Sequence, residues 1–169
     1  MIELHTPISD EDIRGLRVGD TVSISGWILC GRDAVLPKLL TMIEDGRADE
    51  LGVDLQGQVI FHTAVSPAGV GPTSSNKLEI ESSIAPLSKA GIRLHLGKGE
   101  LHPETVRALD EYGAVYAVIP PVTALLGAKT GETRVLAFPE LGMEALHLIR
   151  ADRYPAIIGA AHGRSIYEK

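Results

Sequence analysis

The sequence predicts a single α/β domain over residues 1–169, with a mixed sheet and flanking helices. Segments with the alternation or apolar runs of strands recur along the chain, and segments with helical periodicity separate them. Apolar residues make up 44% of the 169 residues and charged residues 22%, which is enough for one substantial buried core.

The predicted helices have recognisable ends. Ser9 is an N-cap in front of an acidic first turn, and Gly91 and Gly113 are typical helix stops. Pro37 is tolerated because it falls in the first turn of its helix. Helices are predicted for residues 10–15, 36–43, 77–89 and 103–113, and a small one after Pro120-Pro121.

Strands are predicted for residues 21–29, 58–64, 92–96, 114–119, 133–138, 146–149 and 156–160. The segment 114–119 is apolar throughout, as expected of a buried parallel strand. Asp152-Arg153-Tyr154-Pro155 is predicted to separate the last two strands. Residues 66–75, rich in Gly, Pro and Ser, are predicted to form a loop, and residues 44–50 a solvated turn.

Composition excludes several classes of function. A net charge of −6 without any Lys/Arg run argues against nucleic acid as a partner. No apolar stretch approaches the roughly 20 residues of a membrane span, and the N-terminus lacks the pattern of a signal peptide, so we expect a cytoplasmic protein. The single cysteine, Cys30, excludes an internal disulfide and an iron–sulfur cluster held by this chain alone.

Polar segments follow three of the predicted strands: Arg32-Asp33, residues 73–77, and Lys98. If these strands are neighbours, the polar groups converge on one crevice beyond the carboxyl ends of the strands. The set holds the cations Arg32, Lys77 and Lys98, the hydroxyls of Thr73 and Ser74, and the backbone around Gly71. Such a set suits a small dianion such as a dicarboxylate.

The same residues also have a purely structural interpretation. Cations near strand ends are usually solvated, and Ser74-Ser75 would serve equally as a helix N-cap. The histidines lack the spacing of metal ligands, so His62 and His95 are predicted to be hydrogen-bonded structural residues. No nucleotide-binding loop and no hydrolase triad is evident.

Six segments in order resemble those of the β subunits of class I fumarase and L-tartrate dehydratase, over nearly the whole chain. They are residues 6–20, Arg32-Asp33, Gly71-Pro72-Thr73-Ser74-Ser75, Gly97-Lys98-Gly99, Tyr112-Gly113-Ala114-Val115 and Glu140-Leu141-Gly142-Met143-Glu144.

This resemblance implies a swivelling β/β/α-type fold and a hydro-lyase that is active only with a partner. In the family, an α subunit or N-terminal domain carries a four-iron four-sulfur cluster, whose open iron acts on the hydroxyl that leaves as water. By position, Arg32 and Lys98 would bind substrate carboxylates and Thr73 would lie beside the reacting carbons. Lys77 stands where the family has a second arginine.

Departures from the family pattern leave the substrate open between fumarate, tartrate and another 2-hydroxy acid. Lys77 lacks the bidentate fork of arginine, Ser74 replaces a threonine, and Ala64-Val65 replaces a Gly-Pro pair. A second hypothesis is a non-catalytic relative that binds a small carboxylate, and a third is a stand-alone metal-free lyase or isomerase. Without its partner, the chain could form homodimers through the surface that otherwise meets the α subunit.

Overall fold

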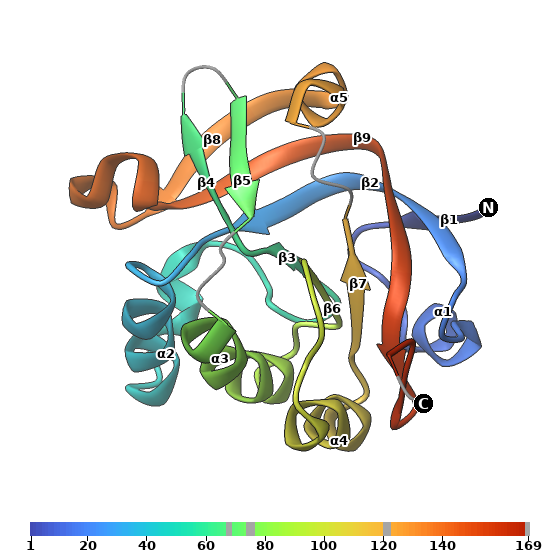
Figure 1. The fold of residues 1–169 in the computed structure, drawn as a ribbon. Helices are drawn as coiled ribbons and strands as arrows, with labels where there is room; N and C mark the ends of the chain where they lie inside the picture. Colours follow the sequence, from blue (N-terminus) through green and yellow to red (C-terminus); the bar gives the residue numbers. More distant parts are fainter. Residues whose placement is uncertain (67–68, 74–76, 120–122, 168–169) are drawn as a thin grey trace.

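The computed structural model describes residues 1–66, 69–73, 77–119 and 123–167, while the side chains of residues 66–80 and 120–125 lie outside the description. The predicted class is confirmed: the chain forms an α/β domain in which helices flank a mixed sheet (Figure 1).

A closed barrel forms the centre of the domain. Strands β2 (Thr21–Cys30), β3 (Val59–Phe61), β6 (Leu94–Gly97) and β7 (Val115–Val118) pair in parallel in this order. The long strand β9 (Leu146–Ala161) runs antiparallel to both β7 and β2 and thereby closes the sheet on itself. Strand β1 (Ile2–His5) pairs with β2, whereas β8 (Thr130–Ala137) and β10 (Arg164–Ser165) pair with β9.

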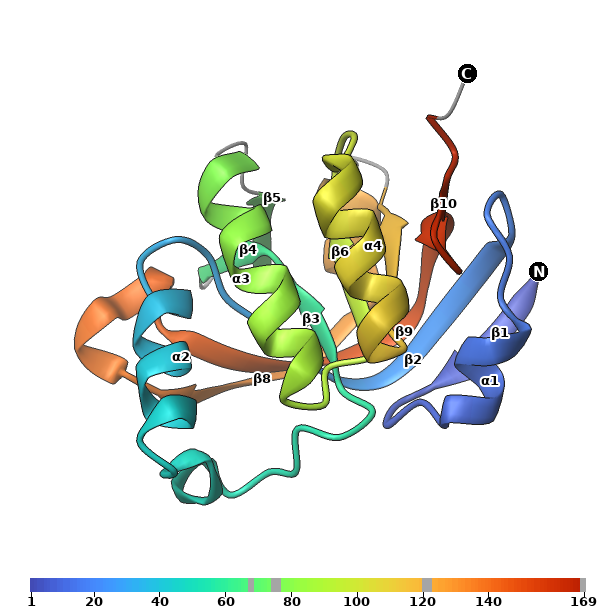
Figure 2. The same cartoon turned by 90° about the horizontal axis from the view of Figure 1, so that it is seen from below.

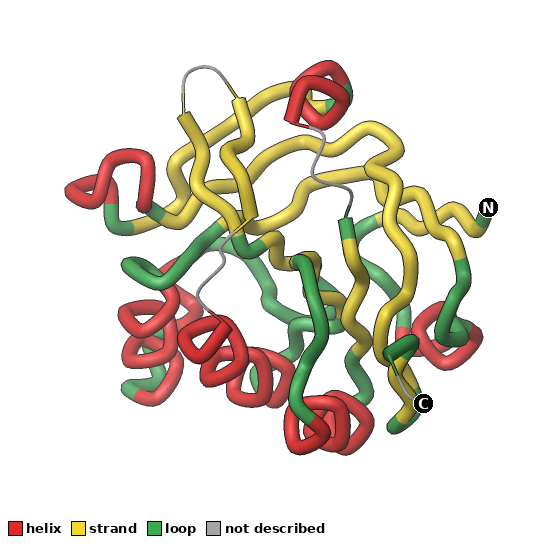
Figure 3. The backbone as a smooth tube through the Cα atoms, in the orientation of Figure 1, coloured by secondary structure: helices red, strands yellow, loops and turns green. Residues whose placement is uncertain are grey.

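Three helices lie side by side along one flank of the barrel: α2 (Leu36–Glu44), α3 (Lys77–Lys89) and α4 (Pro103–Tyr112), as Figures 2 and 3 show. The short helices are α1 (Asp10–Gly15) and α5 (Thr123–Ala128), and the 3₁₀ turns are η1 (Ala48–Leu51) and η2 (Pro139–Glu144). The predicted caps are confirmed, since the Ser9 hydroxyl accepts a bond from the Asp12 N–H and Gly113 adopts the left-handed conformation after α4.

The core has layers on both faces of the barrel wall. Inward-facing residues such as Cys30, Phe61 and Leu96 fill the barrel, and alternate residues such as Leu29 and Ile60 pack outward beneath α2 and α3. A further cluster lies beneath α4. Each fully buried leucine or phenylalanine contributes about 2 kcal/mol relative to an exposed one, so burial on both faces holds the strand ends rigidly.

The prediction of one strand over 58–64 followed by a loop is wrong. The strand divides at His62, and the chain continues as β4 (Thr63–Ser66) and β5 (Gly69–Thr73), which form an antiparallel hairpin. A register irregularity between Thr63 and Val65 accommodates Gly71-Pro72 on the opposite strand. Proline has no N–H to donate, but a bulge in a two-stranded sheet tolerates it, so composition alone indicated a loop.

The prediction of two strands at the C-terminal end is also wrong, because β9 runs unbroken through residues 152–155. Arg153 takes a positive φ of 54° there, and its N–H donates to the Ser25 hydroxyl on β2 at 2.9 Å. A bulge in the β2–β9 ladder therefore absorbs the polar residues. Likewise, the predicted solvated turn at 44–50 contains the start of η1. Across the described part of the chain, every helix is too short or too polar to cross a membrane.

Candidate functional site

Arg32 lies directly beyond the carboxyl end of β2. The N–H of Gly31 still bonds to the Phe61 carbonyl of β3 at 3.1 Å, and the Arg32 carbonyl accepts from the N–H groups of Val35 and Leu36 at the start of α2. A Cβ on Gly31 would come within 2.8 Å of the Val35 side chain, so only glycine permits this close turn. The backbone of Arg32 is therefore fixed from both sides.

The guanidinium of Arg32 binds the carboxylate of Glu144, the last residue of η2. The Nε–H donates to Oε2 at 3.3 Å, and Nη2–H donates to Oε1. The hydrogen bonds that Arg32 donates to Glu144 raise the pKa of Arg32 further, so the guanidinium is charged at every pH of interest. The sequence matched Glu144 to a family segment without giving it a role. The sequence feature that could have pointed to Glu144 was its position just before the predicted strand 146–149, which the structure pairs with β2.

The register of the parallel strands places Arg32 and Lys98 at the same level of the barrel rim. Cys30 pairs with Phe61, and Phe61 pairs with Leu96. Two residues beyond each of these positions stand Arg32, Thr63 and Lys98. The three strands are thus neighbours, which is the condition for their polar groups to converge. We call this set, with Glu144, the carboxyl rim.

Two further predicted residues, Thr73 and Gly71, lie on the hairpin beside this edge. Thr73 pairs with Thr63 across β4 and β5, so its backbone lies beside the carboxyl rim, with Gly71 two residues earlier in β5. Strand β4 also contacts η2, which carries Glu144. Lys77 is the first residue of α3. Ser74 lies outside the described residues, as do the side chains of Thr73 and Lys77.

His62 and His95 form a fully buried pair under α3. His62 Nε2 lies 3.3 Å from His95 Nδ1, and His95 Nε2 lies 2.8 Å from the Ser88 hydroxyl of α3. Burial lowers the pKa of His62 to about 4 and lowers that of His95 well below its usual value, so both rings are neutral. The predicted structural role fits this hydrogen-bonded pair, although His62 Nδ1 has no hydrogen-bond partner among the residues that the structure describes.

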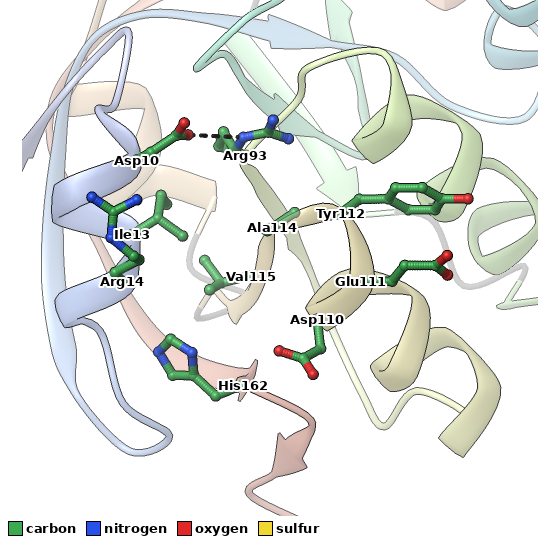
Figure 4. A pocket seen from close by; sticks show the side chains of 11 residues that line it. Asp10, Ile13, Arg14, Arg93, Asp110, Glu111, Tyr112, Ala114, Val115 and His162 are labelled. Atoms are coloured by element: carbon green, nitrogen blue, oxygen red, sulfur yellow. Dashed lines mark hydrogen bonds and ion pairs between the residues drawn. The ribbon is translucent and has the colours of Figure 1, made fainter.

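A cavity of about 360 Å³ lies at the opposite end of the barrel, where β6 and β7 begin (Figure 4). Asp10 and Arg14 of α1 line one side, and Asp110 and Glu111 of α4 line the other. Arg93 Nε donates to Asp10 at 3.1 Å across the upper part of the cavity. Of the predicted site residues whose side chains the structure describes, Arg32 and Lys98, neither lines this cavity.

Cys30 faces the barrel interior, where burial raises the pKa of its thiol and keeps it protonated. The described residues contain no group of three or more His, Cys, Asp or Glu side chains that could hold a metal ion. An iron–sulfur cluster takes three or four thiolates, so the residues of this chain do not fit one by themselves.

Comparison with known proteins identifies the family. The family model described as fumarase C-terminus matches residues 1–169, and the chain therefore belongs to this family.

Three relatives illustrate the likeness. A Geobacillus stearothermophilus protein assigned by name to fumarate hydratase class I is 33% identical over 182 residues, covering 99% of this chain and 34% of the relative. The L(+)-tartrate dehydratase subunit beta of Escherichia coli K12 is 29% identical, covering 96% of this chain and 85% of the relative. A Methanocaldococcus jannaschii protein named as the same subunit is also 29% identical, with 96% and 89% covered. The chain thus spans about a third of the length of the Geobacillus relative.

Proposed function

We propose that this chain is the β subunit of an iron–sulfur hydro-lyase that adds water to, or removes it from, a small 2-hydroxy-dicarboxylate such as malate or tartrate. Its role is to hold the substrate carboxylates in a site shared with a cluster-bearing α subunit. The names of the relatives support both the reaction class and the subunit. The cytoplasm, where thiols are kept reduced, is the proposed location.

The observation that carries this proposal is the composition of the carboxyl rim. Arg32 and Lys98 stand at one level beyond the ends of β2 and β6, the parallel strands on either side of β3, and Thr73 pairs with Thr63, which follows β3. The edge beyond the carboxyl ends of parallel strands is where α/β proteins bind ligands. An arginine fork and a lysine point charge are complementary to the two carboxylates of a small dianion.

The rim cations would contribute most in the transition state. Loss of the proton next to a carboxylate drives negative charge onto that carboxylate, and fixed cations then bind it more strongly than in the ground state. By family resemblance, Arg32, Lys77 and Lys98 bind carboxylates, Gly71 and Ser74 complete the binding segment, and Thr73 lies beside the reacting carbons. A four-iron four-sulfur cluster on the partner would supply Lewis acidity toward the departing hydroxyl.

The test is an anaerobic purification of the tagged chain from its native cells, followed by assays of the eluate. Iron and sulfide content, fumarate hydration and tartrate dehydration are measured on the complex, and the same assays are run on the chain alone. An iron–sulfur partner with either activity, together with an inactive lone chain, is the expected result. The same assays are run on the variant Arg32→Ala. Its matched control is Arg14→Ala, altered in an exposed residue of α1.

An iron–sulfur partner that acts on tartrate and not on fumarate would define the substrate. Recovery of the chain as a homodimer without any iron–sulfur partner would contradict the proposal and favour the carboxylate-binding relative. Hydro-lyase activity in the lone chain would contradict the division of labour between subunits and favour the stand-alone lyase.

A further inference from the structure

We infer that Glu144 is a positioning residue for the substrate: it binds one edge of the Arg32 guanidinium and so presents the other edge to a substrate carboxylate. The inference rests on the proposed function for its catalytic consequence. The geometry of the pair carries it.

Arginine has five N–H donors arranged along two edges, each able to bind a carboxylate through two parallel hydrogen bonds. Glu144 takes the side edge, with Oε2 on Nε at 3.3 Å and Oε1 on Nη2. The end edge, formed by Nη1 and the second hydrogen of Nη2, is not used by Glu144. A second carboxylate can therefore bind end-on without displacing the first.

The backbones on both sides of the pair are held by the fold. The β2–β9 ladder pairs Cys30 with His147, so the residues just beyond β2 lie beside those just before β9. On the second side, Gly142 takes φ 59° and ψ −122°, a conformation that favours glycine, and its carbonyl accepts from the Ala145 N–H at 3.0 Å. This kink turns the end of η2 before β9 begins, and Glu144 lies within the turn.

The exposure of the pair fits a group covered on one side and open on the other. The Arg32 side chain is 29% exposed and that of Glu144 30% exposed. A fully exposed arginine would lose rotamer freedom on binding each substrate molecule, and Glu144 removes that loss in advance. The competing interpretation is that the pair merely attaches η2 to the barrel. Both interpretations couple Glu144 to Arg32, but positioning predicts a loss of kcat/KM with little change in Tm, whereas attachment predicts a loss of kcat/KM that follows from a fall in Tm.

A double-mutant cycle in the assembled complex, measured in both kcat/KM and Tm, separates positioning from attachment. We expect Glu144→Ala to lower kcat/KM about 10- to 100-fold, on the order of the cost of a misplaced binding group. Glu144→Gln should lose less, because one oxygen still accepts from Arg32. In the Arg32→Ala background, Glu144→Ala should cause no further loss, because Glu144 acts through Arg32.

Glu140→Ala, in the same 3₁₀ turn, is the matched control and should leave kcat/KM unchanged. Equal losses of kcat/KM from Glu144→Ala in both backgrounds would show that Glu144 does not act through Arg32, and a loss of kcat/KM matched by a fall in Tm would establish a purely structural attachment; either result would overturn the inference. So would normal kcat/KM for Glu144→Ala with the native Arg32.

Nitrogen–proton NMR of the Arg32 side chain tests the edge assignment without relying on catalysis. Titration of the labelled chain with L-tartrate should shift the Nη signals while the Nε–H signal, bonded to Glu144, stays in place. A shift of Nε–H would mean that the ligand displaces Glu144, and no shift at all would mean that Arg32 does not bind carboxylate; either result overturns the inference. If the complex has no hydro-lyase activity, the proposed function fails, but this titration still decides the role of Glu144.

Discussion

Arg32 and Arg93 present the same side chain at opposite ends of the barrel, with different numbers of donors in use. At the end where β6 begins, Arg93 gives Nε to Asp10 and Nη1 to the carbonyls of Ser88 and Ile92, and its side chain is only 14% exposed. At the carboxyl rim, Glu144 occupies one edge of Arg32. An arginine is suited to binding a ligand when its hydrogen-bond partner within the protein leaves one edge of the guanidinium available.

The two ends of the barrel also differ in shape and in their charged side chains. The cavity near Arg93 is partly open to solvent, and carboxylates of α1 and α4 line it together with the arginines, so an incoming anion meets like charge. The carboxyl rim carries Arg32 and Lys98 at one level, and its carboxylate, Glu144, is already bound to Arg32. Cavity volume and binding chemistry therefore point to different ends, and the chemistry of the donors is the better guide to a dianion.

The largest expected effect separates the two arginines by activity. Arg32→Ala should lower kcat/KM of the assembled enzyme roughly 100-fold. This corresponds to a loss of about 3 kcal/mol of transition-state stabilisation, as for other lost charged contacts. Tm should change little, because the pair is partly exposed. Steady-state kinetics and thermal unfolding measure both quantities. Near-normal turnover would show that Arg32 is not part of the site and that the two arginines do not differ in function.

Acid should weaken the region between the two ends, where His62 and His95 are buried. Their folded pKa values lie below the unfolded value near 6.5, so stability is complete above pH 6.5 and is lost as the pH falls toward the folded pKa of His62, about 4. His62 alone should cost up to about 3 kcal/mol of unfolding free energy by pH 4.

Urea unfolding at a series of pH values measures this loss. His62→Gln should flatten the pH dependence, whereas the control His5→Gln, altered in an exposed strand residue, should retain it. An unchanged slope for His62→Gln would remove the pair as the cause. Comparing activity with unfolding at each pH would then distinguish the loss of folded protein from the titration of groups at the carboxyl rim.

The opposite pattern is expected for Arg93. Arg93→Ala removes the bonds to the Ser88 and Ile92 carbonyls and the contact with Asp10, and should lower the free energy of unfolding by about 1–2 kcal/mol. Because none of the predicted site residues that the structure describes lies there, kcat/KM should stay within about twofold of the parent enzyme at a temperature where the variant is folded. A large loss of kcat/KM in folded protein would transfer the site to the amino end of the strands.

The smallest effect is expected for Lys77→Arg. Arginine would supply the bidentate fork that the family resemblance implies for this position, so activity on a dicarboxylate should be retained or improved. Steady-state kinetics with fumarate and tartrate measure the change, and Lys38→Arg on α2 is a surface control. A large loss would indicate a substrate of a different shape at the carboxyl rim.

The sequence predicted much of this architecture because its signals are local. Ser9 and Gly113 mark helix ends through hydrogen bonds made within a few residues, Pro103 marks one through its fixed φ, and an apolar run marked β7. Local signals failed where pairing outweighs composition. The Gly- and Pro-containing segment 69–73 is a strand because β4 pairs with it, and residues 152–155 stay in β9 because β2 does.

By itself, the sequence determined the α/β class and the order of the main elements. It also determined which polar side chains follow the strands, since these depend on periodicity and capping within short stretches. The tertiary structure decided that β9 closes the barrel, that Arg32 and Lys98 share a level of the rim, and that Glu144 binds Arg32. Arg32 and Glu144 lie 112 positions apart in the chain. Only the packing of a complete core selects such a contact, because no local preference connects residues so distant.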